Sequence, residues 1–93
     1  MIIEVEQDSD TIDCVETDPA KRSAIADSWR AFMRSYLARV FDLPESSVTV
    51  QIGPGMISNV WTWPRDGAPW GPTESEISEY VDKHGYDAWL KSL

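Results

Sequence analysis

The sequence predicts an α+β fold with the element order ββαββα, in which two helices pack on one face of an antiparallel sheet. Two observations support this prediction. Apolar and polar residues alternate near the N-terminus and again around position 50, as they do in half-buried strands. Apolar residues recur every three or four positions in two other segments, each preceded by a residue that caps helices. The chain of 93 residues is expected to form one small domain, residues 1–93.

The N-terminal segment predicts a β-hairpin. Apolar residues alternate with polar ones over residues 3–6 and again over 11–14, and residues 7–10 are of the kinds that form turns. The register that turns the apolar side chains of both strands to one face places Glu4 opposite Asp13 on the other face. Like charges directly opposite each other destabilise a sheet, so this acidic pair is easier to understand if it meets a positively charged partner.

The next segment predicts a long helix. Asp18 is placed as the N-cap and Pro19 at the first helical position, and the helix is expected to run to about Asp42, just before a Leu-Pro pair that would end it. Arg30 and Arg34 fall together on the outer side. The apolar stripe expected to face the core consists of Ile25, Trp29, Phe32, Met33, Tyr36, Leu37 and Val40.

A second hairpin and a second helical region are expected after it. Alternating residues over 48–52 and a returning strand over 56–63 flank a Gly-Pro-Gly turn, and the proline-rich residues 64–72 form a loop. The Thr-Glu-Ser-Glu sequence at 73–76 is a capping box that starts the helix. Gly85 either ends this helix or kinks it. The apolar residues expected to be buried there are Ile77, Tyr80 and Val81, followed by the stripe Tyr86, Trp89, Leu90 and Leu93.

Residues 21–52 resemble the helix-to-strand connection of the tautomerase superfamily. The resemblance rests on a long amphipathic helix, the Leu-Pro-Glu-Ser-Ser sequence at 43–47 and the alternating strand that follows, and it covers about a third of the chain. Enzymes of this superfamily act through an N-terminal proline, whereas Ile2 follows Met1 here. The later proline-rich loop and second helix also depart from that pattern, and no function is transferred from it.

No motif in the sequence indicates catalysis or metal binding. Cys14 and His84 are the single cysteine and histidine, and they lie far apart in the sequence, so no metal-ligand spacing is present. The predicted hairpin turns Cys14 inward, and His84 precedes Gly85 at an expected helix end, which disfavours a thiol–imidazole pair. We therefore expect a protein that is not an enzyme and has no metal and no cofactor.

The N-terminus has neither the basic region nor the apolar region of a signal peptide, and no apolar run approaches the roughly 18 residues of a membrane span. A single cysteine cannot form an internal disulfide. The expected location is therefore cytoplasmic, in a microbe or in an infected host cell.

The charge is strongly acidic and uneven. Sixteen acids against eight bases give a net charge of −8, and residues 1–18 contain seven of these acids and no base. Such a surface repels nucleic acid and anionic membranes but attracts a basic protein surface, for example that of a nucleic-acid-binding complex. We expect no direct contact with nucleic acid or membrane, and a monomer or small homo-oligomer.

The leading functional prediction is a non-enzymatic, protein-binding inhibitor. Acids on alternate residues of a strand lie about 6.6–7 Å apart on one face, where they can imitate a run of phosphates. Phage-encoded inhibitors, including anti-CRISPR proteins and other nucleic-acid mimics, are similar in being small, acidic and poor in motifs. The residues expected to contact the partner are Glu4, Glu6, Asp8, Asp10, Asp13, Glu16, Trp63 and Trp70.

The tryptophans leave alternatives open. Trp61 and Trp63 share one face of a strand, and Trp70 lies in the loop that follows. One or two of them are expected to lie in the core, and the exposed remainder would form a protein contact site. The chain could instead be a structural or assembly subunit that self-associates through the Trp-rich loop and the C-terminal helix. A small hydrolase is the third and weakest alternative.

Overall fold

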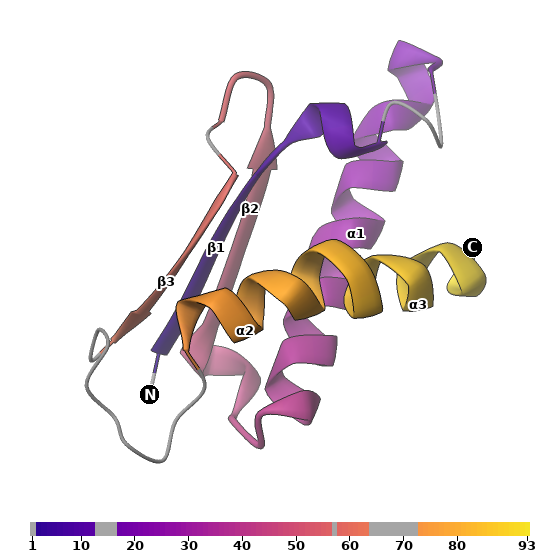
Figure 1. Cartoon of the computed structure of the whole chain (residues 1–93). Helices are drawn as coiled ribbons and strands as arrows, with labels where there is room; N and C mark the ends of the chain where they lie inside the picture. The colour runs from indigo at the N-terminus through magenta and orange to yellow at the C-terminus, as the bar shows by residue number, and fades with distance from the viewer. Residues whose placement is uncertain (1, 13–16, 57, 64–72) are drawn as a thin grey trace.

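The computed structural model describes residues 2–12, 17–56, 58–63 and 73–93 of the chain. These residues form a sheet and a layer of helices (Figure 1). All the longer helical segments lie on one side of the sheet, as predicted, so the α+β class is confirmed. The strands are β1 (Ile2–Asp8), β2 (Val48–Gly53) and β3 (Asn59–Trp63), and the α-helices are α1 (Pro19–Val40), α2 (Glu74–Glu79) and α3 (Tyr86–Ser92). Short helical turns are η1 (Ser9–Ile12) and η2 (Glu45–Ser47), and η3 (Tyr80–Gly85) is a π-helical segment between α2 and α3.

The central strand of the sheet is β1. It pairs in parallel with β2 and antiparallel with β3, which gives the strand order β2-β1-β3. The sheet is therefore mixed, and the predicted antiparallel character holds for only one of the two pairings. The helix α1 provides the crossover that a parallel pair requires, because a short turn cannot return a chain to run in the same direction.

The predicted N-terminal hairpin is wrong, and with it the order ββαββα. The chain leaves β1 through the helical turn η1 instead of a second strand, and the Asp8 carboxylate accepts a hydrogen bond from the Asp10 N–H (3.0 Å) at this point. Glu4 consequently faces Thr49 and Trp61 across the sheet instead of Asp13. Both edges of β1 are occupied by strands that come later in the chain, which leaves no place for a partner from residues 11–14. Residues 13–16 lie outside the described residues.

The second predicted hairpin is also corrected. The turn itself is present, since the Met56 N–H donates to the Gly53 carbonyl (3.4 Å) and Gly55 has a φ of 74°, a conformation that glycine adopts readily. The strands on either side of the turn do not pair with each other, because β1 lies between them. The returning strand begins at Asn59, which leaves a connection long enough to pass over the end of β1.

Both predicted helix starts are confirmed. The Asp18 carboxylate accepts from the Ala20 N–H (2.9 Å) with Pro19 in the first turn, and the Thr73 hydroxyl accepts from the Glu76 N–H (3.1 Å). The end of α1 is a Schellman-type cap in which Asp42 takes the left-handed conformation, with a φ of 55°.

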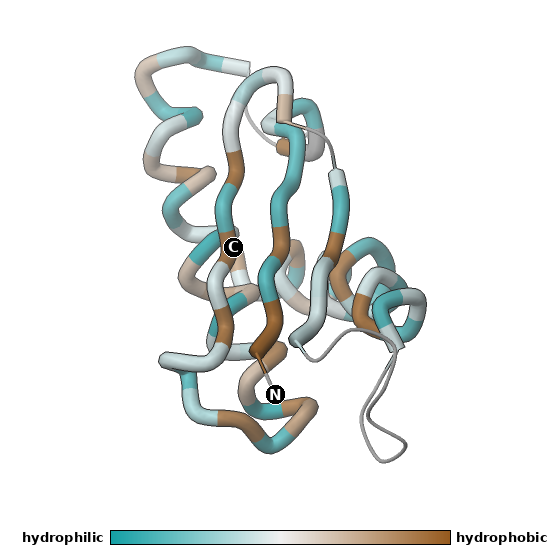
Figure 2. Tube along the Cα trace, turned by 90° about the vertical axis from the view of Figure 1, so that its left-hand side faces the viewer, coloured by the Kyte–Doolittle hydropathy of each residue, from teal (hydrophilic) through white to brown (hydrophobic). Residues whose placement is uncertain are grey.

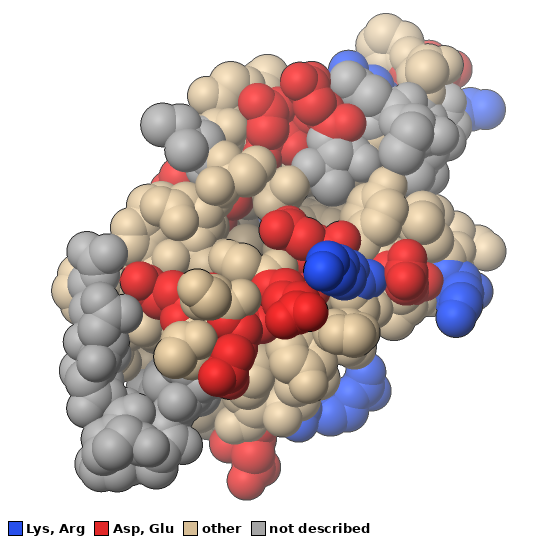
Figure 3. Space-filling view, in the orientation of Figure 1, with Lys and Arg blue, Asp and Glu red and all other residues tan. Residues whose placement is uncertain are grey.

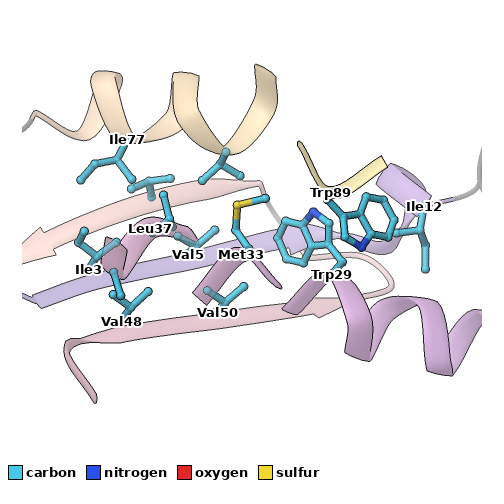
Figure 4. Close-up of a cluster of buried hydrophobic side chains, with 13 residues drawn as sticks. Ile3, Val5, Ile12, Trp29, Met33, Leu37, Val48, Val50, Ile77 and Trp89 are labelled. Atoms are coloured by element: carbon cyan, nitrogen blue, oxygen red, sulfur yellow. The ribbon is translucent and has the colours of Figure 1, made fainter. Parts of the chain in front are cut away.

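The core lies between the sheet and the helices (Figure 4). Alternate residues of β1 are buried, namely Ile3 and Val5, and they meet Trp29, Met33 and Leu37 of α1. The two large indole side chains of the core come from α1 and α3, and Trp61 and Trp63 are outside it. The other buried core residues are Ile12, Ala38, Val48, Val50, Val60, Ile77, Val81 and Trp89.

The ends of the predicted apolar stripes are less buried than expected. Val40, Leu90 and Leu93 are exposed, and Tyr80 is half-buried. The helical region does not end or break at Gly85, which is buried where η3 meets α3 and lies next to Met33 of α1. Glycine therefore serves here to let two helices approach closely.

Candidate protein-contact face

The sheet has one face that no described helix covers, and we call it the open face (Figure 2). Burial alternates along each strand, so the side chains that point away from the helices follow from the register. The members of the open face with described side chains are Ile2, Glu4, Glu6, Asp8, Thr49, Gln51, Asn59, Trp61 and Trp63.

Two carboxylates occupy the middle of the open face. Glu4 lies between Thr49 and Trp61 on the neighbouring strands. Glu6 lies two residues further along β1, about 6.6–7 Å away as the strand repeat requires. None of the members of the open face named above is a lysine or arginine. The described part of this face is therefore negative at its centre, with no basic side chain among its described members.

Aromatic and aliphatic surface lies beside the carboxylates. Trp63 is 47% exposed and is the cross-strand partner of Ile2, which is 48% exposed. Trp61 is half-buried beside Glu4. A carboxylate next to an indole face can receive a lysine or arginine side chain by an ion pair and a cation–π contact together. The open face therefore fits a basic protein surface better than an anionic one.

The predicted contact residues are only partly brought together. Glu4 and Glu6 share the open face with Trp63. Asp8 continues the same alternation at the last residue of β1, where its carboxylate closes the turn into η1, and Asp10 lies in η1 beyond the strand. Asp13, Glu16 and Trp70 lie outside the described residues.

A second group of acids lies over α2 and η3 and was not among the predicted contact residues (Figure 3). Glu76, Glu79 and Asp82 are exposed at three-residue spacing, and Glu79 forms an ion pair with Lys83 (3.8 Å). This spacing of acids in a segment predicted to be helical is the signal that could have identified the group. Glu74 belongs to the same region, but its carboxylate accepts from the Thr62 N–H (3.0 Å) and so helps to hold α2 against β3.

Asp82 also borders a cavity of about 250 Å³ between β1 and the C-terminal helices. Gln7, Trp29, Val81 and Tyr86 form the rest of its lining. Although Asp82 as a whole residue is exposed, the partial burial of its carboxyl against these residues raises its pKa above the ordinary value of 3.8. The charged carboxylate is therefore less stable in the folded protein than in the unfolded chain.

Asp82→Asn is expected to stabilise the protein near neutral pH and to have little effect in acid. The folded protein binds this proton more tightly than the unfolded chain, so the stability linked to Asp82 is present below its ordinary pKa of 3.8 and is lost as the pH rises through the raised value. Urea denaturation midpoints of the two proteins, compared from acid to neutral pH, test this. A difference in midpoint that does not change with pH would show that the carboxyl is not desolvated.

The described residues contain no group of three or more His, Cys, Asp and Glu side chains that could hold a metal ion. His84 is exposed and packs against the ring of Tyr80, with the ring centroids 5.1 Å apart, and Cys14 lies outside the described residues. Within the described part of the chain, no helix is both long and apolar enough to cross a membrane. Comparisons of the chain with protein-family models, curated proteins and solved structures gave no match.

Proposed function

We propose that the chain is a non-enzymatic protein-binding domain that docks its open face on a basic surface of a partner protein. The observation that supports this most strongly is the placement of Glu4 and Glu6 on the uncovered side of the central strand, directly beside Trp61. Surface tryptophan is enriched in protein interfaces and commonly supplies much of the binding energy. The net charge of −8 adds long-range attraction for a basic partner.

The partner class that fits this face best is a protein whose basic groove binds nucleic acid. Lysine and arginine side chains spaced to meet phosphates can pair with Glu4 and Glu6, while an apolar or guanidinium group covers Trp63. A domain bound in this way would occupy the groove and act as an inhibitor.

The test compares two charge-neutralised variants that carry the same net charge. The first, Glu4→Gln with Glu6→Gln, removes both carboxylates of the open face. The second, Glu76→Gln with Glu79→Gln, removes two exposed carboxylates from α2. Binding of a fluorescent nona-arginine peptide is measured by polarisation at several salt concentrations.

The open-face variant is expected to bind the arginine peptide roughly tenfold more weakly than the wild type, because two exposed ion pairs of about 0.2–1 kcal/mol each are lost together with their support of the indole contact. The α2 variant should stay within roughly twofold. Equal losses in both variants would show that net charge alone attracts the peptide, and the proposed face would then be rejected.

Self-association is measured on the same samples by light scattering. The exposed Leu90 of α3 and the C-terminal Leu93 after it are the described residues through which an assembly subunit would pair. An oligomer that dissociates on Leu90→Ser but is unchanged by the open-face variant would replace the proposed function with an assembly role.

A further inference from the structure

A groove runs between α1 and the outer edge of β2. It consists of two adjoining hollows of about 600 and 350 Å³, which share Asp27 and Arg30 in their walls. Small side chains of α1, such as Ala26 and Ala31, leave this space open. The floor is the edge strand itself, from Val48 in one hollow to Gly53 in the other.

The backbone groups of Val50 and Ile52 point into this groove. The N–H and C=O of one strand residue point to the same side, and those of the next residue point to the opposite side. The Arg34 Nε donates to the Val48 carbonyl (3.1 Å) from α1, so Val48 points away from β1, and Val50 and Ile52 do the same. The pairing of β1 agrees. The Val60 and Thr62 N–H groups of β3 point outward, so alternate residues of β1 from Ile2 bond to β3, and those between them bond to Thr49 and Gln51 of β2.

The other edge of the sheet, formed by β3, has side chains bonded to its outward N–H groups, and the described part of the β2 edge does not. On β3, the Val60 N–H donates to the Asn59 side chain (2.9 Å) and the Thr62 N–H donates to the Glu74 carboxylate (3.0 Å). Side chains thus satisfy both outward N–H groups of that strand. No such side-chain bond is found at Val50 or Ile52 among the described residues. An edge with open backbone groups is a template for adding another strand.

The described walls of the groove carry a charge opposite to that of the chain. Among the described residues that line it, Arg22, Arg30 and Arg34 stand with one acid, Asp27, although the whole protein carries −8. Asp27 pairs with Arg30 at 3.0 Å, but both side chains are about half exposed, so the pair is weak and a stronger acidic partner can replace it. The occupant that complements this groove is acidic.

We infer that the β2 edge binds an extended acidic segment of a partner protein by strand addition. The six residues of β2 offer an edge of about 20 Å, so the bound segment is about six residues long. Its backbone pairs with Val50 and Ile52, and the acidic side chains on alternate residues face Arg30 and Arg34. This site adjoins the open face at Thr49, which borders both, but it uses the backbone edge and α1 and does not depend on the proposed function.

The probe for this site is an acetylated, amidated peptide of sequence Thr-Glu-Val-Glu-Val-Glu-Thr. It is added to the isotope-labelled 93-residue chain, and amide hydrogen exchange and chemical shifts are followed by NMR. We expect exchange at Val50 and Ile52 to slow at least tenfold, with the largest shift changes along β2 and the facing side of α1. Arg30→Glu should weaken the peptide at least fivefold. Arg39→Glu, an exposed substitution on α1 outside the groove, makes the same charge change and should have less than a twofold effect.

Four outcomes can overturn the inference. If a peptide with lysine in place of glutamate binds as tightly, the groove does not select an acidic segment. If a peptide that is N-methylated on the residues expected to pair with β2 binds as tightly, binding does not occur by strand addition. Shift changes confined to Glu4 and Glu6, or sedimentation showing that a second copy of the chain already covers β2, would reject the site itself.

Discussion

Gly85→Ala is expected to destabilise the protein by about 2–3 kcal/mol, in the range found when extra atoms are forced into a packed interior. A methyl group at this position would lie 2.6 Å from the backbone oxygen of Tyr80 and 2.8 Å from the Met33 sulfur. The methionine can move, but the oxygen belongs to the π-helical turn of η3, so the helix backbone itself must shift. Urea and thermal denaturation should show a drop in melting temperature of roughly 10 °C or more.

Gly53→Ala is the matched control for this result. A methyl group there meets only the side chain of Met56, at 3.5 Å or more, which is ordinary contact. We expect a change of less than about 0.5 kcal/mol, as is usual for substitutions away from tight packing. If the two alanine variants are equally stable, a Cβ at position 85 does not meet the Tyr80 oxygen, and the π-helical turn of η3 is not as described. Gly85→Ser should behave like Gly85→Ala, since any side chain beginning with a Cβ meets the same oxygen.

Local signals in the sequence predicted the helix starts and the buried faces of the strands. Asp18 and Thr73 cap helices through hydrogen bonds to their own near neighbours, so a few residues determine where those helices begin. Alternation in β1 likewise predicts that Ile3 is buried and Glu4 exposed, whichever strands lie on either side. These features hold in the structure because they depend on little beyond the chain segment that carries them.

The partners of β1 could not be predicted in the same way. Alternation determines which face of a strand is buried but says nothing about the neighbouring strand, and the nearby residues 11–14 had a suitable pattern. The actual partners lie beyond α1, and their pairing depends on how that helix packs on the sheet. The role of Gly85 was hidden for a similar reason, since its neighbour Met33 is distant in the sequence.

The aromatic part of the candidate face was harder to predict than its acidic part. Glu4 and Glu6 point outward as alternation requires. One or two of Trp61, Trp63 and Trp70 were expected to lie in the core, and Trp63 was expected to contact a partner; Trp61 is half-buried, Trp63 is exposed, and Trp70 lies outside the described residues. Trp29 and Trp89 fill the core, and the uncovered sheet face leaves Trp61 and Trp63 at the surface. Only the three-dimensional arrangement shows that one face of a three-stranded sheet has no helix to cover it.

Trp29→Ala is expected to cost about 3–5 kcal/mol of the free energy of unfolding. The Trp29 side chain is fully buried between the sheet and the C-terminal helices, beside the equally buried Trp89 (Figure 4). Its removal leaves a cavity that the β-strands on one side and α3 on the other can fill only partly. A domain of this size has roughly 5–14 kcal/mol of stability in total, so the variant should be largely unfolded well below the melting temperature of the wild type. Circular dichroism melts measure this directly.

Phenylalanine substitutions separate the packing of the two tryptophans from their hydrogen bonding. The Trp89 Nε1–H donates to the Ser28 hydroxyl (3.3 Å), whereas the Trp29 Nε1–H is buried with no partner among the described residues. Trp89→Phe therefore loses packing and a hydrogen bond, while Trp29→Phe loses packing alone. We expect Trp89→Phe to be the more costly of the two by about 0.5–1.5 kcal/mol, because an intramolecular hydrogen bond contributes about that much. The reverse order would mean that the Trp29 indole does find an acceptor in the folded protein, and the Trp29→Ala variant would then lose that bond in addition to its packing.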